Sequence, residues 1–168
     1  TGKKIKGKGW ELVEASRKHS VNIEIYKALR TIFDVMNPKT ARFVWDKLKN
    51  NYYDYGVRSF WLDEAEPEVH PQQFANLKFY LGNGAQTALL YPYYYAKMIY
   101  EGLKEEGEDK IVSLIRAAYP GIQKYGAAVW NGDILSTFEA LRMSVKSGLS
   151  MAMCGIPWEL GYWRIPDG

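Results

Sequence analysis

The chain has 168 residues, 47% of them hydrophobic, with a formal net charge of +3, which suits a single domain with a sizeable core. Residues 1–30 carry eight basic and three acidic groups, so the remainder is near neutral, and this balance argues against a nucleic-acid-binding protein. The single cysteine, Cys154, excludes an intrachain disulfide and a multi-thiolate metal site, and no apolar run is long enough to span a membrane.

The first third of the chain has two stretches of helical periodicity. Residues 10–32 place apolar side chains at helical spacing, with a break near residue 20, and this pattern predicts a helix in a basic N-terminal segment, 1–32. A clearer helix begins at Asn37-Pro38, because Asn37 can accept hydrogen bonds from the free amides and Pro38 lacks the N–H that would stay unpaired. Apolar residues recur at helical spacing as far as Tyr52, and Gly56 ends this unit.

A strand and a long loop follow. Residues 57–62 form an apolar run that predicts a strand, and Asp63 marks its C-terminal end. Residues 64–87 contain prolines, glycines and an Asn-Gly turn signal, which predict a long irregular loop. A loop of this length at the C-terminal end of a strand is usually functional.

The second half of the chain alternates between helical and strand patterns. The predicted helices cover 88–106 and 134–146, and the predicted strands cover 111–115, 126–130 and 148–153. Together with the first helix and strand, this order predicts a parallel α/β arrangement.

Two carboxylates follow predicted strands. Asp63 comes after the run 57–62, and Asp133 lies just beyond the run 126–130. The chain between them is long enough for a crossover helix and another strand. If the strands are parallel neighbours, both side chains emerge at the same edge of the sheet. Two facing carboxylates are the smallest set of catalytic groups that can cleave a glycosidic bond. Each Asp taken alone would more often be an ordinary helix-capping carboxylate. Most of the aromatic residues, which make up 15% of the chain, are expected to pack in the core.

Four segments of the sequence resemble glycoside hydrolase family thirty-one, the retaining α-glycosidases that include α-xylosidases and α-glucosidases. The resemblance covers about residues 33–158. Its segments are Asn37-Pro38 with the helix leading to Asn51-Tyr52-Tyr53-Asp54-Tyr55-Gly56; Phe60 to Glu68; Ile115-Arg116-Ala117-Ala118-Tyr119 through Trp130-Asn131-Gly132-Asp133; and Cys154-Gly155-Ile156-Pro157-Trp158.

The resemblance implies a site as well as a fold. It implies that Asp63 is the catalytic nucleophile and Asp133 the general acid/base, and that Trp61, Arg116 and Trp130 line the subsite for the non-reducing sugar. The implied reaction is hydrolysis of α-linked xylosides or glucosides by double displacement. We expect no metal or other cofactor, and an α-linked oligosaccharide or glycoside as the ligand.

The implied fold is only part of a (β/α)8 barrel. A complete barrel needs about 250 residues and eight strands, whereas this sequence supplies four or five. We therefore expect residues 33–158 to form a partial TIM-barrel catalytic domain, between a divergent N-terminal segment, 1–32, and a divergent C-terminal tail, 159–168. A partial barrel exposes edge strands and an apolar flank, so association with further copies or with a complementary barrel fragment would complete it.

Two alternatives stay open at this point. The chain could be a truncated or engineered barrel fragment whose role is structural or in assembly, without catalysis. It could also be a carbohydrate-binding remnant that holds sugars without cleaving them. Turnover of a glycoside separates the first reading from both alternatives, and sugar binding separates the two alternatives from each other.

Overall fold

The computed structural model describes residues 32–66 and 71–159. Its main sheet has four parallel strands in the order β1-β4-β5-β6. They are β1 (Trp61–Leu62), β4 (Ser113–Ile115), β5 (Ala127–Trp130) and β6 (Trp158–Glu159). The described residues therefore contain the parallel sheet that the sequence predicts, but no closed barrel.

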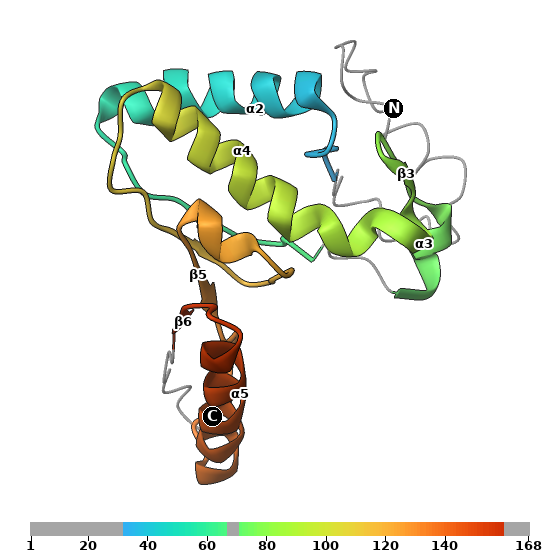
Figure 1. The fold of residues 1–168 in the computed structure, drawn as a ribbon, viewed down its shortest axis with the longest axis vertical. Helices are drawn as coiled ribbons and strands as arrows, with labels where there is room; N and C mark the ends of the chain where they lie inside the picture. Colours follow the sequence, from blue (N-terminus) through green and yellow to red (C-terminus); the bar gives the residue numbers. More distant parts are fainter. Residues whose placement is uncertain (1–31, 67–70, 160–168) are drawn as a thin grey trace, which may run out of the picture.

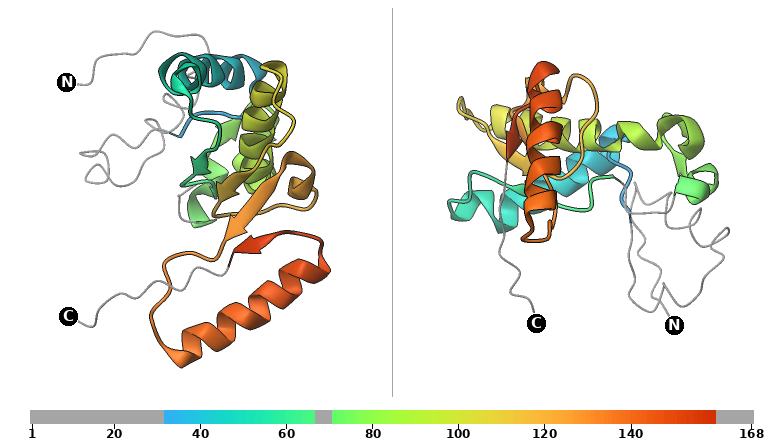
Figure 2. Two further views of the ribbon diagram at one scale, coloured as in Figure 1. Left: turned by 90° about the vertical axis from the view of Figure 1, so that its left-hand side faces the viewer. Right: turned by 90° about the horizontal axis from the view of Figure 1, so that it is seen from below.

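Helices α2 (Pro38–Asn51) and α4 (Tyr91–Glu105) pack on each other and cover one face of this sheet (Figures 1 and 2). The cap predicted for α2 is confirmed, since the Asn37 side chain accepts a hydrogen bond from the amide of Lys39. The two helices approach closely because residue 102 is a glycine: a Cβ there would overlap the indole ring of Trp45. Trp45 is 2% exposed and belongs to the main core.

The register of the strands decides which side chains face the helices. Leu62 lies opposite Ile115, and Ile115 opposite Val129, and all three are buried in the main core beneath α2 and α4. Since side chains alternate along a strand, the neighbouring residues lie on the other face, which we call the inner face. The inner-face residues within the strands are Trp61, Leu114, Ala128 and Trp130.

The predicted loop 64–87 is wrong as a wholly irregular segment. Its described part holds a short antiparallel pair, β2 (Lys78–Phe79) and β3 (Gly82–Asn83), with the 3-10 helix η3 (Pro71–Asn76) before it and α3 (Gly84–Thr87) after it. The pair is held by Asp34, which is buried and accepts a hydrogen bond from the amide of Tyr80. Leu77 and Phe79 form a second small core with Tyr91.

Two other boundaries differ from the sequence-based expectation. The strand predicted over 57–62 contains only Trp61 and Leu62, because the partner β4 is itself three residues long. Just before this strand, the Phe60 carbonyl accepts one hydrogen bond from the amide of Leu114. The strand predicted over 148–153 is wrong, since these residues continue helix α5 (Phe138–Met153). No turn interrupts that helix before Cys154, so the last strand, β6, comes later.

Other predicted elements agree more closely with the structure. The predicted helix 88–106 is a short 3-10 helix, η4 (Ala88–Leu90), followed by α4, and the strand predicted over 126–130 is β5. The tail expected to begin at residue 159 begins inside β6. The helix predicted over 10–32 lies almost wholly outside the described residues. No helix in the described part is long and apolar enough to cross a membrane.

Helix α5 stands apart from α2 and α4 and packs chiefly against β6 (Figures 1 and 2). Only Ser144 of its sixteen residues is buried. Large apolar side chains along the helix are exposed to solvent, and they are Phe138, Leu141, Met143, Val145, Leu149 and Met153. Trp61 on the inner face and the apolar side chains of α5 are thus exposed.

Candidate active site

The C-terminal edge of the sheet gathers four of the five residues that the sequence singles out. Asp63 directly follows β1, and Arg116 directly follows β4. By the alternation of each strand, both return to the inner face, on which Trp61 and Trp130 also lie. In parallel strands the C-terminal ends share one edge of the sheet, so the strand order places these side chains together.

Asp63 and Arg116 form an ion pair at this edge. Arg116 Nη1 lies 3.2 Å from Asp63 Oδ1, and the amide of Glu64 donates to the same oxygen at 3.0 Å. The side chain of Asp63 is 51% exposed. Both contacts are made to Oδ1, so this oxygen of the half-exposed carboxylate is the one that they hold.

Trp61 and Trp130 form the apolar part of the edge. Their ring centroids are 5.2 Å apart and their planes cross at 87°, an edge-to-face pair. Trp61 is 57% exposed, whereas Trp130 is buried. The pair leaves an aromatic surface beside Asp63 on the inner face, which is the type of surface on which sugar rings stack.

Asp133 is the one of these five residues that makes no contact with the others in the described part of the chain. It lies three residues after the end of β5, is exposed, and follows Gly132 in a left-handed conformation with φ 84°. Among residues 32–66 and 71–159, the structure shows no hydrogen bond or ion pair that fixes its carboxylate. It leaves the same edge of the sheet as Asp63, because β1 and β5 both flank β4 in parallel.

Glu66 belongs to this edge as well, although the sequence predicts only that it lies in the loop 64–87. Its Oε1 accepts a 2.8 Å hydrogen bond from Arg116 Nε, so Arg116 bridges Asp63 and Glu66. The signal in the sequence was the spacing of the two acids across the turn Asp63-Glu64-Ala65-Glu66. That spacing alone could not reveal the arginine between them.

Tyr95 lies beneath this loop on α4 and stays a neutral phenol. Burial raises the pKa of Tyr95, and the negative charges of Asp63 and Glu64 raise this pKa further. No group of three or more His, Cys, Asp or Glu side chains that could hold a metal ion occurs among the described residues. The groups that the edge presents are carboxylates, a guanidinium and indole rings.

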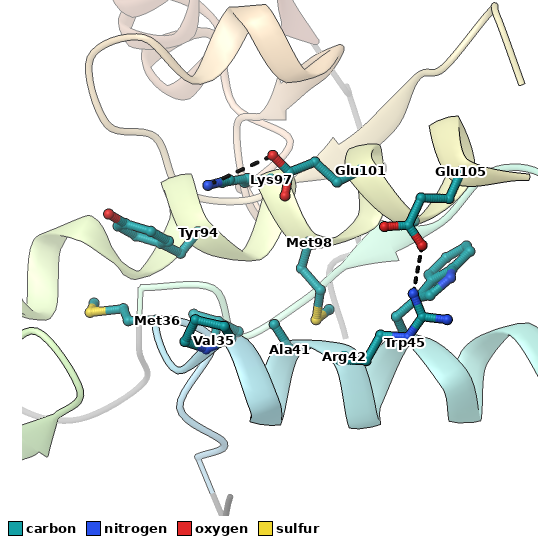
Figure 3. Close-up of a pocket in the computed structure, with 12 residues that line it drawn as sticks. Val35, Met36, Ala41, Arg42, Trp45, Tyr94, Lys97, Met98, Glu101 and Glu105 are labelled. Atoms are coloured by element: carbon teal, nitrogen blue, oxygen red, sulfur yellow. Dashed lines mark hydrogen bonds and ion pairs between the residues drawn. The ribbon is translucent and has the colours of Figure 1, made fainter. Parts of the chain in front are cut away.

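A separate groove of about 230 Å³ lies between α2 and α4 (Figure 3). Its apolar floor includes Ala41, Trp45 and Met98, and an ion pair joins Arg42 to Glu105 at its rim. The helices that form it cover the face of the sheet opposite to Trp61. The groove is therefore distinct from the edge that carries Asp63 and Arg116.

Known proteins are similar to this chain over most of its length. The family description "Glycosyl hydrolases family 31 TIM-barrel domain" matches residues 3–159, a range that includes most of the N-terminal segment expected to diverge. An uncharacterized family 31 glucosidase, ORF2, from Pseudescherichia vulneris is 42% identical over 154 residues, which cover 92% of this chain and 29% of that protein. Alpha-xylosidase A from Aspergillus niger is 32% identical over 158 residues, covering 81% and 21%.

A similar solved structure agrees in fold. The crystal structure of a GH31 alpha-xylosidase from a soil metagenome, complexed with xylose, superposes with a TM-score of 0.77 at 45% identity. The match covers 82% of this chain and 21% of that one. The chain thus spans less than a third of the length of these relatives.

Proposed function

We propose that this chain, which belongs to glycosyl hydrolase family 31, carries the catalytic edge of a retaining α-glycosidase barrel acting on α-linked xylosides or glucosides. The observation that carries the proposal is the shared edge: Asp63 and Asp133 leave the C-terminal ends of two strands that flank β4 in one parallel sheet. Relatives named α-xylosidase and α-glucosidase support this substrate class.

The roles follow from the chemistry of retention. In a retaining enzyme the two carboxyl groups stand about 5–5.5 Å apart, one attacking the anomeric carbon and the other protonating the leaving oxygen. We assign the attack to Oδ2 of Asp63, since Oδ1 is held by Arg116 and by the amide of Glu64. Asp133 donates the proton, and in the second step it takes a proton from the water that releases the sugar.

The remaining residues bind and orient the sugar. Trp61 and Trp130 offer adjoining apolar ring surfaces at the edge. Arg116 holds the nucleophile in place and can donate hydrogen bonds to sugar hydroxyls from the same guanidinium, whose planar fork suits paired contacts. A fixed nucleophile lowers the cost of reaching the transition state, because little rearrangement is left for the reacting atoms.

We also propose that further (β/α) units complete the barrel around this edge. Trp61 on the inner face is 57% exposed, and Phe138 and Met153 on α5 are 89% and 88% exposed. Among residues 32–66 and 71–159, no further strand pairs with β1 or β6 at the two edges of the sheet. Exposed apolar surfaces and strand edges of this kind mark contact sites. Further copies of the chain or a complementary barrel fragment would cover them.

Nitrophenol release from a nitrophenyl α-xyloside and a nitrophenyl α-glucoside tests the catalytic proposal. Wild-type chain should hydrolyse at least one of them, and Asp63→Ala should lower the rate by at least about 10³-fold, because it removes the nucleophile. Asp109→Ala removes an exposed carboxylate that pairs with Lys104 and serves as the matched control. Equal rates for wild type and Asp63→Ala would overturn the proposal. Sugar binding without turnover would instead identify a binding remnant.

A further inference from the structure

We propose that Glu66 is a positioning residue for catalysis: by holding Arg116, it sets the contact between Arg116 and Asp63. This inference rests on the proposed catalytic role of Asp63. Neither the sequence pattern nor the resemblance assigned a role to Glu66.

The bond lengths show which contact fixes the guanidinium. Arg116 Nε donates to Glu66 Oε1 at 2.8 Å, whereas Arg116 Nη1 lies 3.2 Å from Asp63 Oδ1. The Arg116 side chain is only 24% exposed, so it has little freedom to move. A charge-assisted bond at 2.8 Å is the stronger of the two, and it constrains where Nη1 can lie.

The backbone of the loop brings the two acids to one guanidinium. Glu64 has φ 50°, a left-handed conformation that side-chain-bearing residues rarely adopt, and Ala65 is fully buried in the main core. The turn therefore anchors Ala65 inward while Asp63 and Glu66 both reach Arg116. Strained residues of this kind cluster at functional sites, where the surrounding structure holds them.

The second oxygen of Glu66 gives another, independent reason, although the side chain as a whole is 41% exposed. Its Oε2 is buried and has no hydrogen-bond partner in the described part of the chain. An unpaired buried carboxylate oxygen is costly, so stability alone does not favour a carboxylate at this position. Orientation of Arg116 does favour it, because a charged acceptor holds the Nε–H more firmly than a neutral amide would.

Hydrogen exchange of the Arg116 Nε–H, followed by NMR on ¹⁵N-labelled chain, tests the proposal without reference to activity. The signal is assigned from its loss in Arg116→Lys. We expect its exchange with water to be at least about tenfold slower than that of exposed Arg142. Glu66→Gln should remove most of this protection, and Asp63→Asn should leave most of it.

Two results would overturn the proposal. One is wild-type exchange at Arg116 as rapid as at Arg142, which decides the matter even if Glu66→Gln does not fold. The other is protection that survives in folded Glu66→Gln or is lost equally in Asp63→Asn, since either would show that Glu66 does not fix the guanidinium. Thermal unfolding of each variant confirms that the folded state is being compared.

Kinetics provides the functional readout. On a nitrophenyl glycoside that wild-type chain hydrolyses, Glu66→Gln should lower kcat by about tenfold and leave KM within about twofold, because positioning acts on the transition state. Glu101→Gln, a change of the same kind on the outer rim of the α2–α4 groove, should leave both values unchanged. Unchanged kcat in Glu66→Gln would contradict the role. If wild type releases no nitrophenol, the proposed function fails, and the exchange comparison still decides the role of Glu66.

Discussion

The indole rings of Trp61 and Trp130 meet edge to face at a centroid distance of 5.2 Å, although their strands, β1 and β5, are separated by β4. The contact is possible because both side chains lie on the inner face and both are bulky enough to reach across the strand between them. It joins the two strand ends from which Asp63 and Asp133 emerge. The aromatic surface and the carboxylates are therefore parts of one edge.

The first prediction concerns this aromatic pair. Since Trp61 is 57% exposed, we expect Trp61→Ala to lower the free energy of unfolding by no more than about 1.5 kcal/mol, the upper value of an edge-to-face pair. We expect the same change to weaken xylose or glucose binding at least about fivefold, an effect near 1 kcal/mol, because it removes the exposed member of the aromatic pair. Urea unfolding and calorimetric titration measure the two effects.

Tyr55→Ala is the matched control for Trp61→Ala, since Tyr55 is an 83% exposed aromatic outside the catalytic edge. It should leave sugar binding unchanged. Equal sugar affinity in wild type, Trp61→Ala and Tyr55→Ala would show that the tryptophan surface does not contact the sugar.

The second prediction concerns the contact between α2 and α4. In an exposed helix interior, alanine stabilises the helix by about 1 kcal/mol relative to glycine. We nevertheless expect Gly102→Ala to destabilise the chain by about 1–3 kcal/mol. The reason is steric: the added Cβ would overlap the ring of Trp45, which is fully buried beneath α4 (Figure 3). Denaturant unfolding shows directly whether Gly102→Ala lowers or raises the free energy of unfolding. A more stable Gly102→Ala would mean that the helices do not pack this closely.

The third prediction is a dependence of stability on alkaline pH. Burial raises the pKa of the Tyr91 phenol well above its usual value, and the hydroxyl donates a 3.0 Å hydrogen bond to the Phe33 carbonyl. The unfolded chain loses this proton near pH 10, whereas the folded chain keeps it. The stabilising contribution is therefore full below about pH 10 and is lost as the pH rises towards the folded-state pKa, with a slope of up to about 1.4 kcal/mol per pH unit.

Tyr91→Phe should reduce this alkaline slope, because it removes the titrating group. It should also cost about 1 kcal/mol at neutral pH, since the Phe33 carbonyl loses its donor. Urea unfolding at a series of pH values measures both effects, and Tyr55→Phe, at an exposed tyrosine, is the control. An unchanged slope in Tyr91→Phe would show that a group other than Tyr91 causes the loss of stability at alkaline pH.

The fourth prediction concerns association through α5. Leu149 is 65% exposed and lines an apolar groove with Ile156 and Trp158. If this surface joins barrel units, Leu149→Glu should shift the chain to a monomer in sedimentation velocity, because a charge would have to be buried in the contact. Lys146→Glu, on the same helix but outside the groove, should leave association unchanged. A wild-type chain that stays monomeric at all concentrations would contradict self-association.

The parallel architecture could be predicted from the sequence because local signals and periodicity agreed. Asn37-Pro38 fixes the start of α2, and the apolar runs before Asp63 and Asp133 contain β1 and β5. The residues 148–153 were misassigned since small and apolar residues fit a buried strand and a helix equally well. The length of the uninterrupted run from Phe138 favoured the helix.

The site could be predicted only in part. Strand-end position indicates which residues share an edge, but it does not indicate which side chains touch. The contact of Trp61 with Trp130 depends on the strand order, and the bridge from Arg116 to Glu66 depends on the left-handed turn at Glu64. A non-glycine residue in that conformation leaves no clear mark in the sequence.

Covalent trapping of the nucleophile is the most direct test of the proposal that Asp63 attacks the sugar. An activated fluorinated α-xylosyl or α-glucosyl donor, whose fluorine slows the release of the glycosyl-enzyme intermediate, is incubated with the assembled chain, and the labelled peptide is located by mass spectrometry. We expect one glycosyl group on Asp63 and none in Asp63→Asn. A label on any other residue, or no label in chain that sedimentation shows to be assembled, would contradict it.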